Sequence, residues 1–345
     1  MKLATLKSTS LDGQLVVVSR DQRLAKVVPD IASTLQQAID RWEEVSGALK
    51  RVYDGINEPC DFLPKGTVAF NPNEACSPLP RAYQWCDGST YIAHTERMHR
   101  WRQLEIPNVL FEEPLVYQGG ADTFLGPCDP IELGSEEWGL DFEAEIAVIT
   151  GAVRMGTPVS RAGTHIKLLM LCNDISLRNL IPRELSKGFG FYQSKPSSAF
   201  SPVAVTPDEL GTDWDGSRLH ATVVSILNGI EFGRPNSGVE MQFGFADIIG
   251  HAAKTRDLGP GSIFGSGTVA NRDISVGSSC ITERRMIETI QNGKAKTDYM
   301  KFGDRVRIEA FGSDGASLFG AINQVVEPFR RRACRARKPK SVTAI

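Results

Sequence analysis

The stretch DFEAEIAV, residues 141–148, is the most informative segment of this 345-residue chain. Acidic and apolar side chains alternate along it with the period of two that is typical of a β-strand. Glu143 and Glu145 would therefore lie side by side on one face, with Cα atoms roughly 7 Å apart. Buried carboxylates this close repel each other unless a cation lies between them, and oxygen ligands suit Mg²⁺, Ca²⁺ or Mn²⁺. The alternative is a half-exposed strand whose glutamates face water.

A third acidic group follows the apolar run LLMLC, residues 168–172, which is typical of a buried strand. That strand runs into NDISLR, residues 173–178. Asp174 is placed there to add a third carboxylate ligand, and Arg178 to bind an anionic substrate group through two hydrogen bonds. An Asx turn that ends the strand, with Arg178 on the surface, fits the same residues.

The segment YQWCDGSTYIAH, residues 83–94, carries an aspartate and a histidine seven residues apart. A helix is predicted to begin at about Tyr91 and to end near Leu104, so His94 would lie in its first turn. Asp87 is a candidate fourth oxygen ligand, and His94 is a candidate general base that deprotonates water. The alternative for His94 is a partly exposed helical side chain without a catalytic role.

Composition limits the possible partners. Residues 330–345 hold seven of the 39 Lys and Arg residues and none of the 41 Asp and Glu residues, so residues 1–329 carry a net charge of −9. A body this acidic argues against general nucleic-acid binding, which depends on basic groups that displace counterions. We find no apolar run of membrane-spanning length, no signal-peptide pattern and no C-x-x-C among the seven cysteines. These features favour a cytoplasmic protein.

The chain divides into three parts by pattern. Residues 1–78 predict a small α+β domain with strands at Lys2–Lys7 and Gln14–Ser19 and one amphipathic helix over residues 35–56. Residues 79–329 contain many short strands and few helices, which favours a predominantly β sandwich or roll over alternating βαβ units. The fold class is therefore α+β. Residues 330–345 are basic, lack apolar periodicity and are predicted to be disordered.

The order of these motifs resembles the fumarylacetoacetate hydrolase family over residues 79–329. The shared order is Asp…His, E-x-E, N-D-x-S-x-R, a lysine in QSKP (residues 193–196) and GSGT (residues 265–268). The resemblance to the bacterial fumarylacetoacetate hydrolase group is closer than that to the shorter acylpyruvate hydrolases. The resemblance implies a mixed β-roll catalytic domain, a divalent cation and hydrolysis of a carbon–carbon bond between carbonyl groups. It also implies a homodimer, and it is the basis for expecting one.

The resemblance assigns roles to individual residues. It implies that Arg178 and Lys195 hold the substrate and the developing oxyanion, and that Thr268 offers a substrate-binding hydroxyl. His94 resembles the general base of the family. The predicted metal ligands are Asp87, Glu143, Glu145 and Asp174.

Three positions depart from the family pattern. Hydrolytic members place an acid beside the base, and strict counting reaches Thr282; we favour Glu283, which would require a bulge in the segment expected to be a strand. Fumarylacetoacetate hydrolase has a glutamine where this chain has Ile181 and a tyrosine where it has Ser89. These differences bear on the identity of the substrate.

Three functions are open at this point. The first is a metal-dependent hydrolase of a 1,3-diketo acid, foremost fumarylacetoacetate, which yields fumarate and acetoacetate, with acylpyruvates as further candidates. The second is a decarboxylase or tautomerase of a 2-oxo acid such as oxaloacetate, as in relatives without the His/Glu pair. The third is a metal- or ligand-binding protein that has no catalytic activity.

Overall fold

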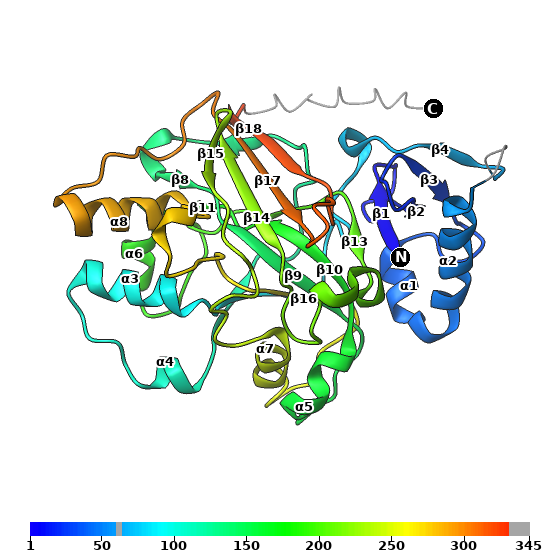
Figure 1. Cartoon of the computed structure of the whole chain (residues 1–345), viewed down its shortest axis with the longest axis horizontal. Helices are drawn as coiled ribbons and strands as arrows, with labels where there is room; N and C mark the ends of the chain where they lie inside the picture. Colours follow the sequence, from blue (N-terminus) through cyan, green and yellow to red (C-terminus); the bar gives the residue numbers. More distant parts are fainter. Residues whose placement is uncertain (60–63, 331–345) are drawn as a thin grey trace, which may run out of the picture.

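The computed structural model describes residues 1–59 and 64–330. The chain has the predicted α+β architecture, with two large β-sheets and few helices (Figure 1). Apart from Arg330, the basic segment predicted to be disordered lies outside the described residues.

The larger sheet has eleven strands and runs through most of the molecule in the order β4-β3-β2-β1-β13-β10-β9-β16-β5-β6, with β12 paired to β10. Its strands are β1 (Lys2–Leu6), β2 (Gln14–Val18), β3 (Leu24–Val27), β4 (Thr67–Ala69), β5 (Trp85–Ser89), β6 (Leu115–Gly119), β9 (Ala144–Thr150), β10 (Ile166–Asn173), β12 (Ala199–Phe200), β13 (Ala204–Val205) and β16 (Ser262–Gly265).

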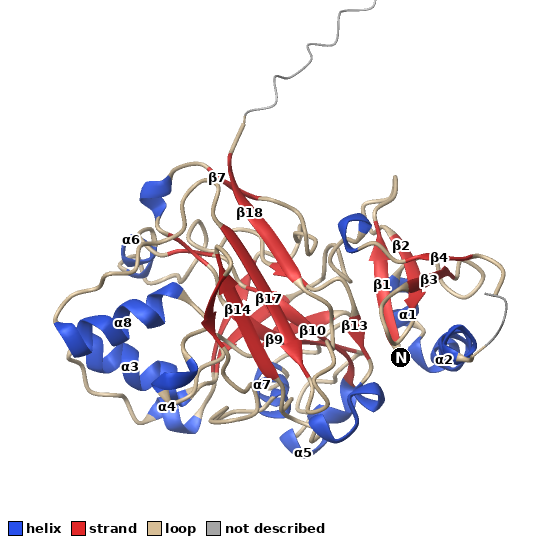
Figure 2. Ribbon diagram, turned by 45° about the horizontal axis from the view of Figure 1, so that its top comes forward, coloured by secondary structure: helices blue, strands red, loops and turns tan. Residues whose placement is uncertain are grey.

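A second sheet packs across β9 and β10 and gives the sandwich (Figure 2). Its order is β15-β14-β17-β18-β7. Its strands are β7 (Ile131–Leu133), β14 (Thr222–Leu227), β15 (Ile230–Gly233), β17 (Arg305–Phe311) and β18 (Ile322–Pro328), and a separate pair joins β8 (Leu140–Asp141) to β11 (Ser176–Leu177).

Helices surround the sheets. They are α1 (Leu35–Asp40), α2 (Trp42–Asn57), α3 (Ile92–Arg102), α4 (Val109–Glu112), α5 (Val159–Ala162), α6 (Ile181–Leu185), α7 (Phe245–Ala252) and α8 (Ile281–Asn292). The pair α1 and α2 lies beside β1–β3, while α3 and α8 pack together at the opposite end (Figures 1 and 2). No helix among the described residues is both long and apolar enough to span a membrane.

The single helix predicted over residues 35–56 is two helices, so that prediction is wrong in detail. The backbone of Arg41 leaves helical geometry, with φ −123° and ψ 34°, and this separates α1 from α2. Thr34 caps α1, because its hydroxyl accepts a hydrogen bond from the Gln37 N–H at 3.2 Å. The apolar spacing persists across the break, so periodicity alone could not locate it.

The two faces of the central strands contact different partners. In β9, Ile146 and Val148 point into the core shared with the second sheet, where they belong to the same cluster as Ile308. Ala147 and Ile149 point the other way, into a cluster completed by α1 and α2. Both faces of this strand are therefore buried, which fixes its register strongly because a slip of one residue would exchange the two sets.

The N-terminal strands are continuous with the rest of the sheet. Lys2 and Leu3 of β1 pair with Val205 and Ala204 of β13, which pairs in turn with β10. The division at residue 78 thus crosses a shared sheet, and the assignment of residues 1–78 and 79–329 to separate domains stays a prediction.

Candidate active site

Four carboxylates from the strands β5, β9 and β10, or from residues next to them, meet within the large sheet. Asp87 lies in β5, Glu145 lies in β9 with Glu143 immediately before it, and Asp174 follows the last residue of β10. One oxygen from each of them lies within 4.8 Å of the others. Glu143 is 5 % exposed and Glu145 is fully buried, so a water-facing E-x-E pair is excluded. The structure brings all four predicted ligands together.

A glycine-containing turn makes room for this cluster. Gly265 of β16 pairs with Asp87, and a Cβ atom at Gly265 would lie 2.3 Å from Oδ1 of Asp87 and 3.0 Å from Oε2 of Glu145. Gly267 has φ +78°, a conformation that favours glycine, and its N–H donates to Asp87 Oδ1 at 3.2 Å. The GSGT segment is therefore a close-packed wall of the site.

The donor set fits a divalent cation. Both carboxylate oxygens of Glu145 are buried and lack a hydrogen-bond partner among the described residues. A buried carboxylate without partners costs several kcal/mol. A cation at the centre of the cluster would satisfy Glu145, and oxygen-only ligands are those that Mg²⁺, Ca²⁺ and Mn²⁺ prefer.

The charges of the cluster are strongly coupled. Burial, reinforced by the nearby charge of Asp174, raises the pKa of Asp87 well above its usual range. Burial and the charge of Asp87 do the same to the pKa of Glu145. Burial also acts to raise the pKa of Glu143, but Arg178 and Lys195 outweigh it and lower the pKa to about 2.

Two cationic side chains, Arg178 and Lys195, border the cluster. Lys195 Nζ lies 2.9 Å from Glu143 and 2.5 Å from Asp174. Arg178 donates to Glu143 through one terminal nitrogen and to Asp141 through Nε at 2.8 Å. These are the groups that can neutralise a cluster of carboxylates and also contact an anionic substrate.

Several supporting side chains were not identified from the sequence. Tyr117 of β6 donates its hydroxyl hydrogen bond to Asp174 at 2.6 Å, and Ser198 donates to the other oxygen of Asp174 at 2.7 Å. Asp141, which lies in the DFEAEIAV segment, accepts a hydrogen bond from Arg178. No spacing rule in the sequence links residues 117 and 198 to residue 174, because their proximity arises from strand pairing and a loop.

The structure places Glu283 beside His94, with 3.3 Å between its Oε1 atom and Nδ1 of His94. The segment is not a bulged strand, however, and that part of the prediction is wrong. Glu283 lies in the first turn of α8. The Asp141 carboxylate accepts hydrogen bonds from the backbone N–H groups of Ile281 and Thr282, at 2.7 and 2.9 Å. These bonds stabilise a helix N-terminus there, and helical spacing turns Glu283 toward His94.

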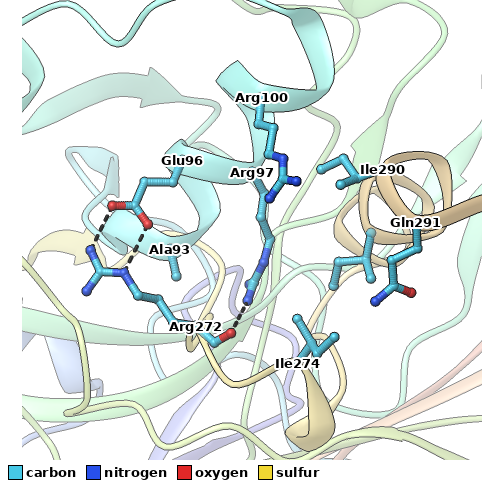
Figure 3. Close-up of a pocket in the computed structure, with 9 residues that line it drawn as sticks. Ala93, Glu96, Arg97, Arg100, Arg272, Ile274, Ile290 and Gln291 are labelled. Carbon is cyan, nitrogen blue, oxygen red and sulfur yellow. Dashed lines mark hydrogen bonds and ion pairs between the residues drawn. The ribbon is translucent and has the colours of Figure 1, made fainter.

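Arg97, which was not identified from the sequence either, contacts Glu283 of the His94–Glu283 pair. Its side chain is 11 % exposed and donates to Glu283 Oε1 at 2.8 Å. It extends from α3 toward the loop at Arg272 and bonds the Arg272 carbonyl at 3.1 Å (Figure 3). This part of α3 borders a second cavity of about 440 Å³ between α3 and α8. Arg97 is three residues after His94, one helical turn away, which is the only signal the sequence offered.

A cavity of about 370 Å³ opens onto the carboxylate cluster. Thr268, 6 % exposed, is part of its wall as predicted, and so are Ser89 and Ile181, the two departures from the family pattern. Every predicted site residue lines this cavity except Glu145, Asp174 and Glu283. These three lie directly behind the lining residues. All of the predicted residues thus converge on one region.

Fold and cavity together define a protein with a buried oxygen-ligand site for a divalent cation beside a His–Glu pair. The protein-family model described as fumarylacetoacetate (FAA) hydrolase C-terminal matches residues 84–327. The family model described as fumarylacetoacetase N-terminal domain 2 matches residues 1–81. Since the first match alone spans more than half of the chain, the protein belongs to the fumarylacetoacetate hydrolase family.

Two similar proteins are named as oxaloacetate tautomerases. The chain is 22 % identical over 243 residues to the human mitochondrial oxaloacetate tautomerase FAHD2A, covering 70 % of each chain. It is 23 % identical over 262 residues to the oxaloacetate tautomerase YisK of Bacillus subtilis, covering 74 % of this chain and 82 % of the relative.

Among solved structures, the maleylpyruvate hydrolase from Sphingobium sp. SYK-6, in complex with manganese(II) and pyruvate, shares the fold. The TM-score is 0.63 at 15 % identity, over 95 % of this chain and all of the other.

Proposed function

We propose that this protein is a cation-dependent hydrolase that cleaves a carbon–carbon bond in a 1,3-diketo acid. The observation that carries the proposal is the presence, around one cavity, of a four-carboxylate cluster, two cationic side chains and a buried His–Glu pair. A binding protein would not need the last of these. The proposed metal ligands are Asp87, Glu143, Glu145 and Asp174, and the proposed catalytic residues are His94, Glu283, Arg178 and Lys195.

A divalent cation held by the four carboxylates would supply Lewis-acid polarisation of the substrate's carbonyl groups. The maleylpyruvate hydrolase complex makes Mn²⁺ a reasonable ion to test beside Mg²⁺ and Ca²⁺. Arg178 and Lys195 would bind the anionic end of the substrate and stabilise the oxyanion that forms during attack. Thr268 would add a hydrogen bond from the cavity wall.

His94 would act as the base. With its Nδ1–H directed at Glu283, its Nε2 keeps the lone pair that accepts a proton from water. The water oxygen then forms a bond to one carbonyl carbon, and the bond from that carbon to the CH₂ between the two carbonyls breaks. The CH₂ carbon takes the electron pair and gains a proton from the imidazolium, so that it becomes a CH₃ group. Glu283 stabilises the imidazolium. The products are a carboxylic acid and a methyl ketone acid; fumarylacetoacetate would give fumarate and acetoacetate.

A second candidate is a tautomerase or decarboxylase of oxaloacetate, and the names of the two tautomerase relatives support the tautomerase. Retention of His94 and Glu283 favours hydrolysis. Both functions use the same cation site, so only substrate assays distinguish them. The cytoplasmic location and the homodimer stay predictions.

The test uses the purified chain loaded with Mn²⁺, assayed on fumarylacetoacetate, acetylpyruvate and oxaloacetate. We expect hydrolysis of a diketo acid that is abolished by EDTA and reduced at least about 100-fold in Glu143→Ala, with Glu137→Ala, a change of an exposed glutamate, as the control. His94→Ala should lower kcat far more than it raises KM. Full activity after thorough chelation would contradict the cation requirement, and turnover of oxaloacetate alone would favour the second candidate.

A further inference from the structure

The wall of the active-site cavity changes character along its depth. The inner end is polar and carries the carboxylate cluster. The outer end is formed by apolar side chains from α3, β6, α6 and the loop before Lys195. We call this set the outer wall; its members are Met98, Leu115, Val116, Ile181 and Phe191.

The outer wall follows from local geometry. Met98 is four residues after His94 on α3, so the two side chains lie on one side of the helix, one turn apart. Leu115 is two residues before Tyr117 on β6 and therefore shares its face. His94 and Tyr117 thus each have an apolar neighbour on the same side of their element.

Strand register confirms the direction of this change. Tyr117 pairs with Asp87 of the cluster, whereas Leu115 pairs with Ser89 at the far end of β5. The ring of Phe191 meets that of Tyr117 edge to face, with 5.2 Å between their centroids, and so continues the apolar surface.

Within the described part of the chain, the outer wall itself contains no cationic side chain. Among the described residues that line the cavity, the permanently charged cations are Arg178 and Lys195. Both are bound to carboxylates at the inner end, Arg178 to Asp141 and Glu143 and Lys195 to Glu143 and Asp174. The polar side chain at the level of Leu115 is the uncharged Ser89.

Building on the proposed function, we infer that the substrate has one carboxylate, at the cationic inner end, and that its acyl group is an uncharged hydrocarbon chain packed on the outer wall. A second carboxylate at the end of the acyl group would lose water without gaining a cationic partner. A hydrocarbon chain gains from the same apolar surface. On this ground the four-carbon fumaryl group, which ends in a carboxylate, fits less well than an alkanoyl group of similar length.

The glutamine and tyrosine that the family resemblance associates with fumarylacetoacetate are Ile181 and Ser89 in this chain, and both line this cavity. The exchange at residue 181 removes an amide that could hydrogen-bond a distal carboxylate. The inference names Ile181 and Met98 as specificity-determining residues.

The experiment compares two substrates that differ only at the end of the acyl chain. Butanoylpyruvate ends in a methyl group, and succinylpyruvate has a carboxylate in its place. For the Mn²⁺-loaded protein we expect kcat/KM for butanoylpyruvate to exceed that for succinylpyruvate at least ten-fold. We also expect it to rise about four-fold per methylene from acetylpyruvate to butanoylpyruvate.

Variants reverse the preference. Ile181→Lys and Met98→Lys place a cation at the outer wall. Each should raise the ratio of kcat/KM for succinylpyruvate to kcat/KM for butanoylpyruvate by ten-fold or more. The control is Ile230→Lys, which adds the same charge at a position that is 75 % exposed, and it should leave the ratio unchanged. An equal or greater kcat/KM for succinylpyruvate in the unmodified protein would overturn the inference.

Dissociation constants of both compounds, measured by calorimetry on Mn²⁺-loaded His94→Ala, separate this inference from the proposed function. If the unmodified protein hydrolyses neither compound, nor fumarylacetoacetate or acetylpyruvate, the proposed hydrolysis fails. A dissociation constant that is ten-fold lower for butanoylpyruvate than for succinylpyruvate then still supports the preference for an apolar chain. The absence of that difference overturns it.

Discussion

Glu283 is a fully buried carboxylate that contacts two neighbouring side chains. Its Oε1 atom contacts both His94 and Arg97, while Oε2 has no hydrogen-bond partner among the described residues. Burying a carboxylate is costly unless a positive charge lies beside it. Arg97 supplies that charge, and its bonds to the loop at Arg272 hold it in place.

Replacement of Arg97 should therefore impair the base without affecting substrate binding. We expect Arg97→Gln to lower kcat at least about ten-fold with little change in KM, because Glu283 loses its charge partner. Arg97→Lys should recover part of the loss. Arg100→Gln, an exposed position one turn farther along α3, is the control. Activities are compared at a temperature where circular dichroism shows each variant folded; an unchanged kcat would contradict this role.

At the scale of elements, the loop that presents Lys195 is anchored by Glu184 of α6. The carboxylate accepts hydrogen bonds from the backbone N–H groups of Tyr192, Gln193 and Ser194, at 3.0, 2.7 and 3.1 Å. The Ser194 hydroxyl donates a further bond at 2.6 Å. Burial acts to raise the pKa of Glu184, but these bonds outweigh it and lower the pKa to about 2.

This anchor should make stability depend on pH. Because the folded-state pKa lies below the unfolded value of about 4.3, the stabilisation is present above that value and is lost as the pH falls toward about 2. We expect Glu184→Gln to lower the free energy of unfolding by about 1–3 kcal/mol at pH 7 and by clearly less at pH 3. Urea unfolding at pH 7 and at pH 3 measures this change in the free energy of unfolding, with Glu137→Gln as the control. A loss that is the same at both pH values would contradict the assignment.

The start of α8 shows what element prediction could not reach. The sequence around residue 283 was expected to be a strand, and the choice between Thr282 and Glu283 depended on a bulge. The helix begins there because Asp141, 140 residues earlier in the chain, accepts bonds from its first backbone N–H groups. Local propensity could not anticipate a stabilising carboxylate from so distant a residue.

At the scale of the molecule, the N-terminal part supplies one end of the large sheet and one of its covering layers. Strand β1 closes the edge of β13, and α1 and α2 complete the apolar cluster that contains Leu168 and Met170 of β10. The strand that leads to Asp174 is therefore buried on one side by residues 1–78.

A truncated chain of residues 79–345 should consequently fail to behave as an independent folded unit. We expect it to aggregate or to bind an apolar dye strongly, since it exposes a strand edge and an apolar face. Size-exclusion chromatography and dye fluorescence, compared with the intact chain, measure this. A monodisperse fragment that melts cooperatively at the temperature of the intact chain would contradict it.

The sequence by itself determined the α+β class, the strand that begins between Glu143 and Glu145, and the proposed ligand and catalytic residues that gather around the cavity. The first two follow from periodicity, and the third from the order of short motifs that the chain shares with the family. Only the tertiary structure decided that both faces of β9 are buried, that Glu283 lies on a helix, and that Arg97 and Tyr117 support the site. It also placed Ser89 and Ile181 on one cavity wall. These depend on contacts between residues far apart in the chain, where packing and charge compensation override local preference.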